Sequence, residues 1–454
     1  MQRERSNISA IQDLCEEFRK YNRIDASLYE KFDVKRGLRN QDGTGVMAGL
    51  TQICNVHGYV LNEGEREAIP GELYYRGYNI RDIVAGCQDE GRFGYEEVIY
   101  LLLFGVLPSK EQLGMFNQVM AHFMYLPDTF FEDMMLKAPS PNIMNKLARS
   151  VLALYSYDEN ADDTSLEAEL GKALQLIAKM PNLMVKAYQV KRRSYDGDTM
   201  FLHPEKEGLS YAEEILSLLR ADREYTREEA LLLDLCLILH AEHGGGNNST
   251  FACRVLSSSG TDAYSAYAGA IGALKGPLHG GANIKVLEMI QMLREAVQNP
   301  LDKGQVADYL RRVLNREAGD GSGKIYGMGH AVYTISDPRA IIFKENAVRL
   351  ARGTEYEEDF ELLNIIEEVT PQLFAERGNP KPICANVDLY SGFVYRMLKI
   401  PQDLFTPLFA ASRMAGWSAH RIEELFTGGR IIRPAYKSVS KPQKYLPLGA
   451  RGGN

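Results

Sequence analysis

The feature that most constrains the fold is a helix that the sequence predicts to be buried on every side. Thr226-Arg-Glu-Glu229 has the spacing of a capping box, in which Thr and Glu side chains satisfy backbone donors at a helix start. Leucine and isoleucine then occupy nearly every face of a helix running to His243, and three glycines at 244–246 end the pattern. A helix that is apolar all round belongs in the interior of a large helical core.

Helical patterns also dominate the rest of the chain. They follow one another from about residue 94, and examples are 95–104, 263–275, a segment from about 283, one opened by Asp337-Pro338, and 402–426. Only residues 52–78, where tyrosine and valine alternate with glycine, are typical of short strands or a hairpin. Residues 438–454 have the composition of a loosely held tail. The predicted fold is mainly α, with a small N-terminal β element.

Composition narrows the functional classes. The chain has 454 residues, 45% of them hydrophobic, and this length favours two or three domains. Its net charge of -8 makes nucleic acid or an anionic membrane a poor partner. The longest apolar run, Leu231 to Leu239, is interrupted by Asp234 and is too short to span a bilayer. The first residues do not resemble a secretory or transit signal, so a cytoplasmic location is expected.

Cysteine and histidine spacing gives no sign of a metal site. The six cysteines lack a Cys-x-x-Cys pair, so buried reduced thiols are expected rather than disulfides or a zinc knuckle. His240-Ala-Glu-His243 differs from the metalloprotease motif. These two histidines are equally compatible with a shared cavity and with capping of the helix end. His243-Gly-Gly-Gly246 also imitates an esterase oxyanion loop, but no Gly-x-Ser-x-Gly elbow accompanies it.

Three glycine-framed segments carry ionisable side chains. They are Gly276-Pro-Leu-His279-Gly-Gly-Ala-Asn283, Gly327-Met-Gly-His330-Ala-Val-Tyr333 and Asn386-Val-Asp388-Leu-Tyr-Ser-Gly392. Glycine lets the backbone turn sharply and approach a ligand closely. Two imidazoles and one carboxylate are the groups needed to remove a proton next to a carbonyl. Taken singly, each histidine is compatible with a structural loop residue, and Asp388 with a helix N-cap.

These segments, in this order, resemble citrate synthase. The resemblance also includes His240 to Phe251, Asp337-Pro-Arg339, Ser412-Arg413 with Gly416-Trp417, and Arg433-Pro434. Leu73-Tyr-Tyr-Arg-Gly-Tyr-Asn-Ile80 and Glu96 to Gly105 are similar to the family's early segments, so the resemblance covers roughly residues 70 to 434.

The resemblance implies an acyltransferase of the tricarboxylic acid cycle that condenses acetyl-CoA with oxaloacetate and hydrolyses citryl-CoA to citrate and CoA. Asp388 would remove a methyl proton, His279 would donate a hydrogen bond to the thioester oxygen, and His330 would polarise the ketone of oxaloacetate. The oxaloacetate carboxylates would be bound by His243, Arg339 and Arg413, and by Arg433 from the other subunit of a homodimer. The family needs no metal and no tightly bound cofactor, since the CoA thioester is a substrate.

The coenzyme A contacts are where the chain departs from the family pattern. A basic residue often stands four positions after the histidine of the Gly327 motif, and here Thr334 occupies that place. Phosphate binding is therefore assigned to other basic groups, Lys324 or Lys381, and Tyr326 and Gly327 are further predicted contacts of coenzyme A.

The family has two helical domains, one inserted in the other. Mapped here, the large domain comprises residues 1–282 and 395–454, and the small domain residues 283–394. Closure of one on the other would assemble the site and exclude water from the thioester. The N-terminal section before Leu73 is longer than in compact family members.

Several rival functions share parts of this pattern. A 2-methylcitrate synthase would use propionyl-CoA, and one methylene is worth only about 1–3 kcal/mol of discrimination. A citryl-CoA-cleaving enzyme, a thioester hydrolase and a catalytically silent helical scaffold are the others. The presence of all three proposed catalytic residues argues against the scaffold, and the absence of an attached CoA-ligase portion argues against ATP-dependent cleavage.

Overall fold

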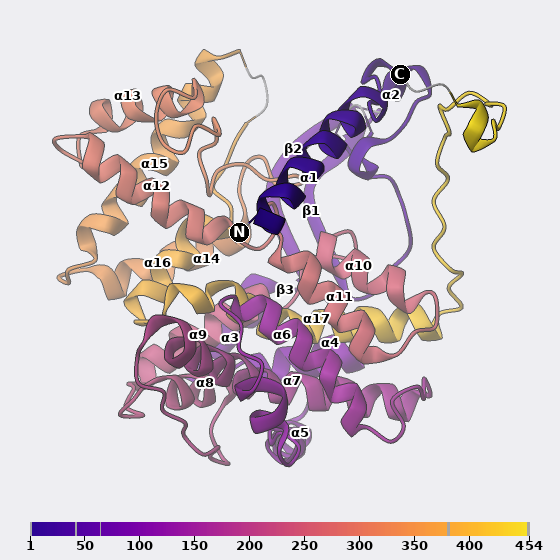
Figure 1. Cartoon of the computed structure of the whole chain (residues 1–454). Helices are drawn as coiled ribbons and strands as arrows, with labels where there is room; N and C mark the ends of the chain where they lie inside the picture. The colour runs from indigo at the N-terminus through magenta and orange to yellow at the C-terminus, as the bar shows by residue number, and fades with distance from the viewer. Residues whose placement is uncertain (1, 41–42, 64, 379–381, 452–454) are drawn as a thin grey trace. The chain divides into compact units, whose positions relative to one another are not determined.

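The computed structural model describes residues 2–40, 43–63, 65–378 and 382–451, and α-helices dominate it (Figure 1). The α-helices are α1 (Gln2–Tyr21), α2 (Ser27–Lys31), α3 (Ile80–Asp89), α4 (Tyr95–Phe104), α5 (Lys110–Phe123), α6 (Ile143–Ala153), α7 (Leu166–Lys191), α8 (Tyr211–Leu219), α9 (Arg227–His240), α10 (Asn248–Ser257), α11 (Ala263–Lys275), α12 (Ala282–Ala296), α13 (Lys303–Leu314), α14 (Pro338–Ala351), α15 (Glu357–Glu376), α16 (Val387–Met397) and α17 (Phe405–Phe426). Short 3₁₀ or π turns are η1 (Arg36–Leu38), η2 (Phe131–Leu136), η3 (Leu154–Tyr157), η4 (Arg192–Asp196), η5 (Gln402–Leu404) and η6 (Leu448–Ala450). The mainly α prediction is confirmed.

A single small antiparallel sheet in the described residues confirms the predicted hairpin. Its strands are β1 (Cys54–Asn62), β2 (Glu65–Tyr75) and β3 (Tyr78–Asn79), in the order β1-β2-β3. The hairpin supports the segment that follows His330. The Gly71 amide donates to Ser336 Oγ (3.1 Å), and a Cβ at Gly71 would lie 2.1 Å from the Ser336 carbonyl oxygen. Only glycine allows this strand to lie so close to that segment.

The chain forms two compact units. One comprises Gly49–Ile432, and the other joins Met1–Ala48 to Arg433–Asn454. Within the second unit, the Lys437 ammonium lies 5.4 Å from the centre of the Phe32 ring. Within the first unit, α12 to α16 pack on one another, as the salmon-to-orange helices of Figure 1 show. The division into domains of 1–282 with 395–454, and 283–394, stays a prediction.

Helix α9 is buried as predicted, but it ends at His240 rather than His243. The reason lies in distant side chains that take up the carbonyl groups of its last turn. Ser412 Oγ donates to the Leu237 carbonyl (2.5 Å), Tyr75 Oη to Ile238 (3.0 Å) and Arg413 Nε to His240 (2.7 Å). Carbonyls satisfied in this way need no further helical turn. His243 therefore lies on a loop beyond the helix end.

The six cysteines are free thiols in this structure. Cys87, Cys236, Cys253 and Cys384 are buried, as expected, whereas Cys15 is exposed and Cys54 is half-buried. Among the described helices, none is both long and apolar enough to cross a membrane.

Candidate active site

Two glycine-containing loops are joined by backbone hydrogen bonds, so the segments that carry His330 and Asp388 lie side by side. The Gly329 amide donates to the Cys384 carbonyl (2.8 Å), and the Asn386 amide donates to the Gly327 carbonyl (2.9 Å). The Asn386 side chain adds a bond from Nδ2 to the Gly329 carbonyl (2.8 Å). Gly327 has φ +81°, and a Cβ there would lie 2.8 Å from Leu389 Cα. Both conditions exclude a larger residue.

His330 is held in one tautomer by its own loop. The amides of Val332 and Tyr333 donate to His330 Nδ1 at 3.1 and 3.0 Å. A nitrogen that accepts hydrogen bonds carries a lone pair, so the proton of the neutral ring is on Nε2. The Tyr333 ring stacks on the imidazole with 4.7 Å between ring centres, and the Tyr333 hydroxyl donates to the Glu72 carbonyl (3.2 Å). His330 is thus set to donate through Nε2.

His279 has the opposite tautomer. It lies between α11 and α12, and its Nε2 accepts a hydrogen bond from the Ser249 amide (3.3 Å) and lies 3.0 Å from Ser249 Oγ. The proton of the neutral ring is therefore on Nδ1. Burial, and then the charge of Arg413, lower the pKa of His279 to about 4. Near pH 7 the imidazole is neutral and can donate from Nδ1 to a carbonyl oxygen.

Asp388 lies in the first turn of α16, and Asn386 rather than Asp388 is the N-cap of that helix. Its amide donates to Asn386 Oδ1 (3.0 Å), which leaves the carboxylate available for other contacts. Burial raises the pKa of Asp388 to about 6, although the charge of Arg339 works in the opposite direction. A carboxylate with a raised pKa is a stronger base while remaining ionised near pH 7.

His243 lies against His330 and Tyr333, with ring centres 5.2 and 5.6 Å apart. Burial, and then the charge of Arg339, lower the pKa of His243 well below its usual value, so its imidazole is neutral. His243 Nε2 is buried and has no hydrogen-bond partner in the structure. By contrast, the His240 side chain packs among Phe343, Tyr395 and Phe409, with both ring nitrogens buried and unpaired.

Arg339 and Arg413 are both buried, but their partners differ. Arg339, in the first turn of α14, donates to Asp337 through Nε (3.0 Å) and Nη2 (2.7 Å). Arg413, fully buried in α17, uses only Nε, while Nη1 and Nη2 have no partner. A buried guanidinium edge without acceptors is unfavourable unless a ligand supplies them, and a carboxylate fits that edge. Together with His243 Nε2, Arg413 therefore makes a candidate site for a small anion.

The residues predicted to bind coenzyme A are only partly assembled. Gly327 is buried in the loop described above, and Tyr326 Oη donates to Asp320 Oδ2 (2.6 Å). The exposed Lys324 lines a pocket with Tyr326 and Lys285. Lys381 lies outside the described residues.

Arg433 belongs to the unit formed with the N-terminal 48 residues, separate from the unit that holds the histidines. Its contribution to a partner's site stays a prediction. In the described part of the chain, no group of three or more His, Cys, Asp or Glu side chains is arranged to hold a metal ion.

Sequence reasoning missed two residues that shape the site. Ser249 orients His279 and also accepts a hydrogen bond from Trp417 Nε1 (3.2 Å), and Tyr333 stacks on His330. Both lie inside motifs that the sequence displays, so their positions were visible. Their contacts were not visible, because the Ser249–His279 contact joins segments 30 positions apart and the stacking of Tyr333 on His330 depends on the folded loop.

Comparisons with known proteins show which family the chain belongs to. The family model described as citrate synthase, C-terminal domain, matches residues 40–435. Citrate synthase of Haloferax volcanii is 36% identical over 426 residues, covering 92% of this chain and 99% of its own. 2-Methylcitrate synthase 1 of Corynebacterium glutamicum is 34% identical, covering 84% of this chain and 92% of its own. The solved ternary complex of Thermoplasma acidophilum citrate synthase with carboxymethyl coenzyme A and oxaloacetate has a TM-score of 0.74 at 28% identity, covering 92% of this chain and 99% of its own.

The matching family model and relatives make this chain an enzyme of the acyltransferase class. The chain belongs to the citrate synthase family.

Proposed function

We propose that this enzyme condenses acetyl-CoA with oxaloacetate and hydrolyses the resulting citryl-CoA to citrate and CoA. The observation that carries the proposal is that the two histidines accept backbone amides on opposite ring nitrogens, Nε2 in His279 and Nδ1 in His330, which implies opposite tautomers. His279 presents Nδ1–H and His330 presents Nε2–H, and Asp388 has a raised pKa. Two neutral donors and one base match a reaction in which two carbonyl oxygens gain negative charge while one C–H bond breaks.

In the first step, Asp388 takes a proton from the thioester methyl group. The electron pair moves onto the thioester oxygen, which receives a hydrogen bond from His279 Nδ1. A carbon acid as weak as a thioester needs this stabilisation at the moment its proton leaves. The low pKa of His279 keeps its ring neutral. The hydrogen bond from this ring therefore stabilises the enolate, and the ring does not replace Asp388 as the base.

In the second step, the enolate carbon attacks the ketone carbon of oxaloacetate. His330 Nε2 donates a hydrogen bond to the ketone oxygen as it becomes an alkoxide. That oxygen takes up one proton from water to become the hydroxyl of citryl-CoA, and Asp388 returns to water the proton that it took from the methyl group. Water then cleaves the thioester, releasing citrate and CoA. The anion site of His243, Arg339 and Arg413 would hold the carboxylates of oxaloacetate during both steps. The related Thermoplasma acidophilum enzyme forms a ternary complex with oxaloacetate and a coenzyme A derivative, which supports this pair of ligands.

The assembly proposed with this reaction is a homodimer in which Arg433 of one chain completes the anion site of the other. Its guanidinium would donate hydrogen bonds to the distal carboxylate of oxaloacetate, in addition to those of Arg339 and Arg413. Lys324, Tyr326 and Gly327 are proposed to contact coenzyme A, since Lys324 and Tyr326 share a pocket near the loop of His330.

A second candidate is 2-methylcitrate synthesis from propionyl-CoA, because a 2-methylcitrate synthase is similar over 84% of this chain. A thiol-release assay with acetyl-CoA and with propionyl-CoA, each with and without oxaloacetate, tests both. The proposal expects oxaloacetate-dependent release that is faster with acetyl-CoA. Faster thiol release with propionyl-CoA would favour the second candidate. Thiol release at the same rate with and without oxaloacetate would rule out both.

A further inference from the structure

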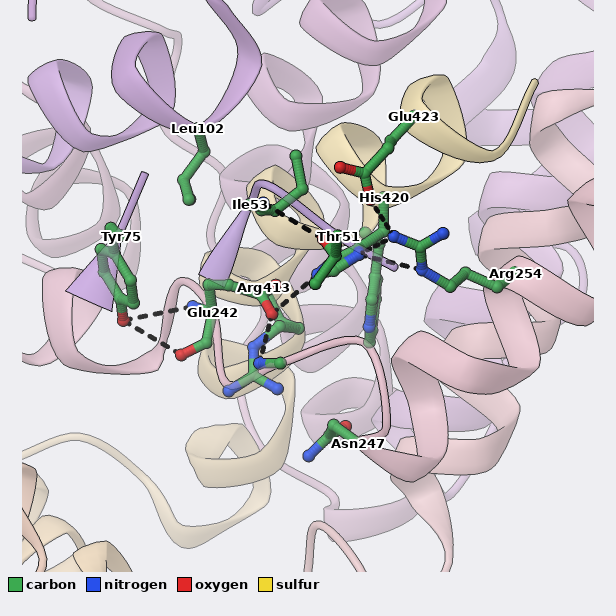
Figure 2. A network of polar contacts seen from close by, with 12 residues as sticks. Thr51, Ile53, Tyr75, Leu102, Glu242, Asn247, Arg254, Arg413, His420 and Glu423 are labelled. Carbon is green, nitrogen blue, oxygen red and sulfur yellow. Dashed lines mark hydrogen bonds and ion pairs between the residues drawn. The ribbon is translucent and has the colours of Figure 1, made fainter. Parts of the chain in front are cut away.

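A chain of charged side chains is buried beneath the loop that carries His243. Glu242 and His420 are fully buried, and Arg254 is 8% exposed. Figure 2 shows Arg254, His420 and Glu423 in contact, with Glu242 and Arg413 beside them. Arg254 also pairs with Glu424, from Nη1 to Oε2 (2.7 Å). Apart from Arg413, none of these residues takes part in the reaction described above.

The direction of the hydrogen bonds through this network is fixed. Arg254 Nε donates to His420 Nδ1 (3.0 Å), so the proton of the His420 ring is on Nε2. His420 Nε2 in turn donates to Glu242 Oε1 (2.9 Å). Burial by itself would raise the pKa of Glu242, but the interaction with His420 and the charge of Arg413 bring it below its usual value. Glu242 is therefore a carboxylate at neutral pH.

Glu242 connects this network to the anion site in two ways. First, its Oε1 accepts a hydrogen bond from the Gly244 amide (2.5 Å). This bond links the residues on either side of His243 and so restrains the backbone of His243. The Glu242 amide donates to the Tyr75 hydroxyl (3.3 Å), which fixes the other side of His243. Second, its negative charge is the largest attraction acting on the buried Arg413. The side chain also packs closely against α17, since a Cβ at Gly416 would lie 2.1 Å from Glu242 Oε2.

We propose that His420 and Arg254 are positioning residues that act through Glu242 to hold His243 and Arg413 in the geometry that binds oxaloacetate. This inference rests on the proposed function. His420 fixes the carboxylate through one hydrogen bond, and Arg254 fixes the tautomer of His420. The network reaches as far as the start of β1, where the Gln52 amide donates to Glu423 Oε1 (2.7 Å).

A purely structural role predicts something different, and the same helix supplies the comparison. Arg421, the residue after His420, forms a fully buried ion pair with Glu169 through Nε (2.7 Å) and Nη2 (2.6 Å). Removing one partner from either buried group destabilises the fold, because the other partner is left unpaired. Of these two buried groups, the His420 network contacts the residues that flank His243 and the Arg421–Glu169 pair does not. Glu169→Gln is therefore the matched control.

The test compares three variants by oxaloacetate titration and by steady-state kinetics. His420→Leu removes both hydrogen bonds, and we expect the oxaloacetate Kd and KM to rise about tenfold or more. His420→Gln restores them, because an amide offers one acceptor and one donor about as far apart as the two ring nitrogens, and we expect values within about threefold of wild type. Glu169→Gln should lower the denaturation midpoint and leave the oxaloacetate Kd and KM unchanged.

Arg254→Lys extends the test to a position nearer the surface. A lysine keeps the charge but cannot serve His420 and both glutamates together, so the oxaloacetate KM should rise at least about threefold. Unchanged oxaloacetate affinity in His420→Leu, or in Arg254→Lys if the first variant does not fold, overturns the inference. The inference is also overturned if Glu169→Gln loses as much oxaloacetate affinity as His420→Leu. It is overturned as well if His420→Gln binds oxaloacetate no more tightly than His420→Leu. A wild-type protein that does not bind oxaloacetate would overturn the proposed function as well, and the two failures are thus distinguishable.

Discussion

Replacing Asp388 by asparagine should lower turnover by orders of magnitude and, at neutral pH, stabilise the protein. The pKa of Asp388 is about 6 in the folded chain, against the usual value of 3.8. Each unit of difference between these pKa values corresponds to about 1.4 kcal/mol, so keeping this carboxylate ionised costs the folded state up to about 3 kcal/mol. The side chain is half-buried and solvent screens part of that cost, so we expect Asp388→Asn to gain about 1–2 kcal/mol at pH 7.5.

The gain must depend on pH in a defined direction. A carboxyl group whose pKa is raised by folding contributes stability at low pH, and that contribution is lost as pH rises through about 6. Asparagine does not titrate, so its advantage over the wild type should shrink by more than half at about pH 4.5. In Asp388→Asn, kcat should fall by about 10²–10⁴-fold relative to the wild type, because that is the usual contribution of a general base.

Urea unfolding at both pH values and one fixed protein concentration measures the effect, because assembly makes apparent stability depend on concentration. Asp82→Asn is the control, since Asp82 is an exposed carboxylate in the first turn of α3. Its loss should destabilise the protein by about 0.3–1 kcal/mol, through the helix dipole. If Asp388→Asn is no more stable than wild type at pH 7.5, or if its gain is the same at both pH values, the raised pKa is wrong.

Three other predictions follow from the site. In the wild type, kcat should rise with pH to a plateau through an apparent pKa of about 6, because Asp388 must be ionised, and a flat profile from pH 5 to 8 would contradict that role. Arg413→Lys should raise the oxaloacetate KM by about 10–100-fold, since an ammonium cannot replace the two unpaired guanidinium nitrogens, and an unchanged KM would remove Arg413 from the anion site. Arg433→Ala and Asp388→Ala chains, each inactive alone, should recover about a quarter of wild-type activity when refolded together, whereas no recovery from verified mixed dimers would place Arg433 outside the shared site.

The helical core could be predicted from local patterns. The capping box at Thr226 does form, with Thr226 Oγ1 accepting from the Glu229 amide (3.2 Å), and the leucines behind it are buried. The end of α9 was predicted three residues too late. The side chains that satisfy its last carbonyls come from Tyr75 and from Ser412 and Arg413, and no local pattern links them to this helix.

The candidate site shows the same division. The histidines and Asp388 stand in glycine-framed segments, so their identities could be read from the sequence. The tautomers could not, because they depend on amides of Ser249, Val332 and Tyr333 whose directions only the folded loops define.

His420 offered one signal. It lies seven residues after Arg413, which places both on one face of a helix. Its partner Glu242, however, comes from a segment 178 positions away.

The central claim is that a C–H bond of the thioester methyl group breaks so that this carbon can bond to oxaloacetate. Acetyl-CoA with a fully deuterated methyl group tests this directly, with product analysis by mass spectrometry in the presence of oxaloacetate. The account predicts citrate that retains two of the three deuterium atoms, because one is removed before the new carbon–carbon bond forms. Acetate that retains all three deuterium atoms, formed equally well without oxaloacetate, would contradict it.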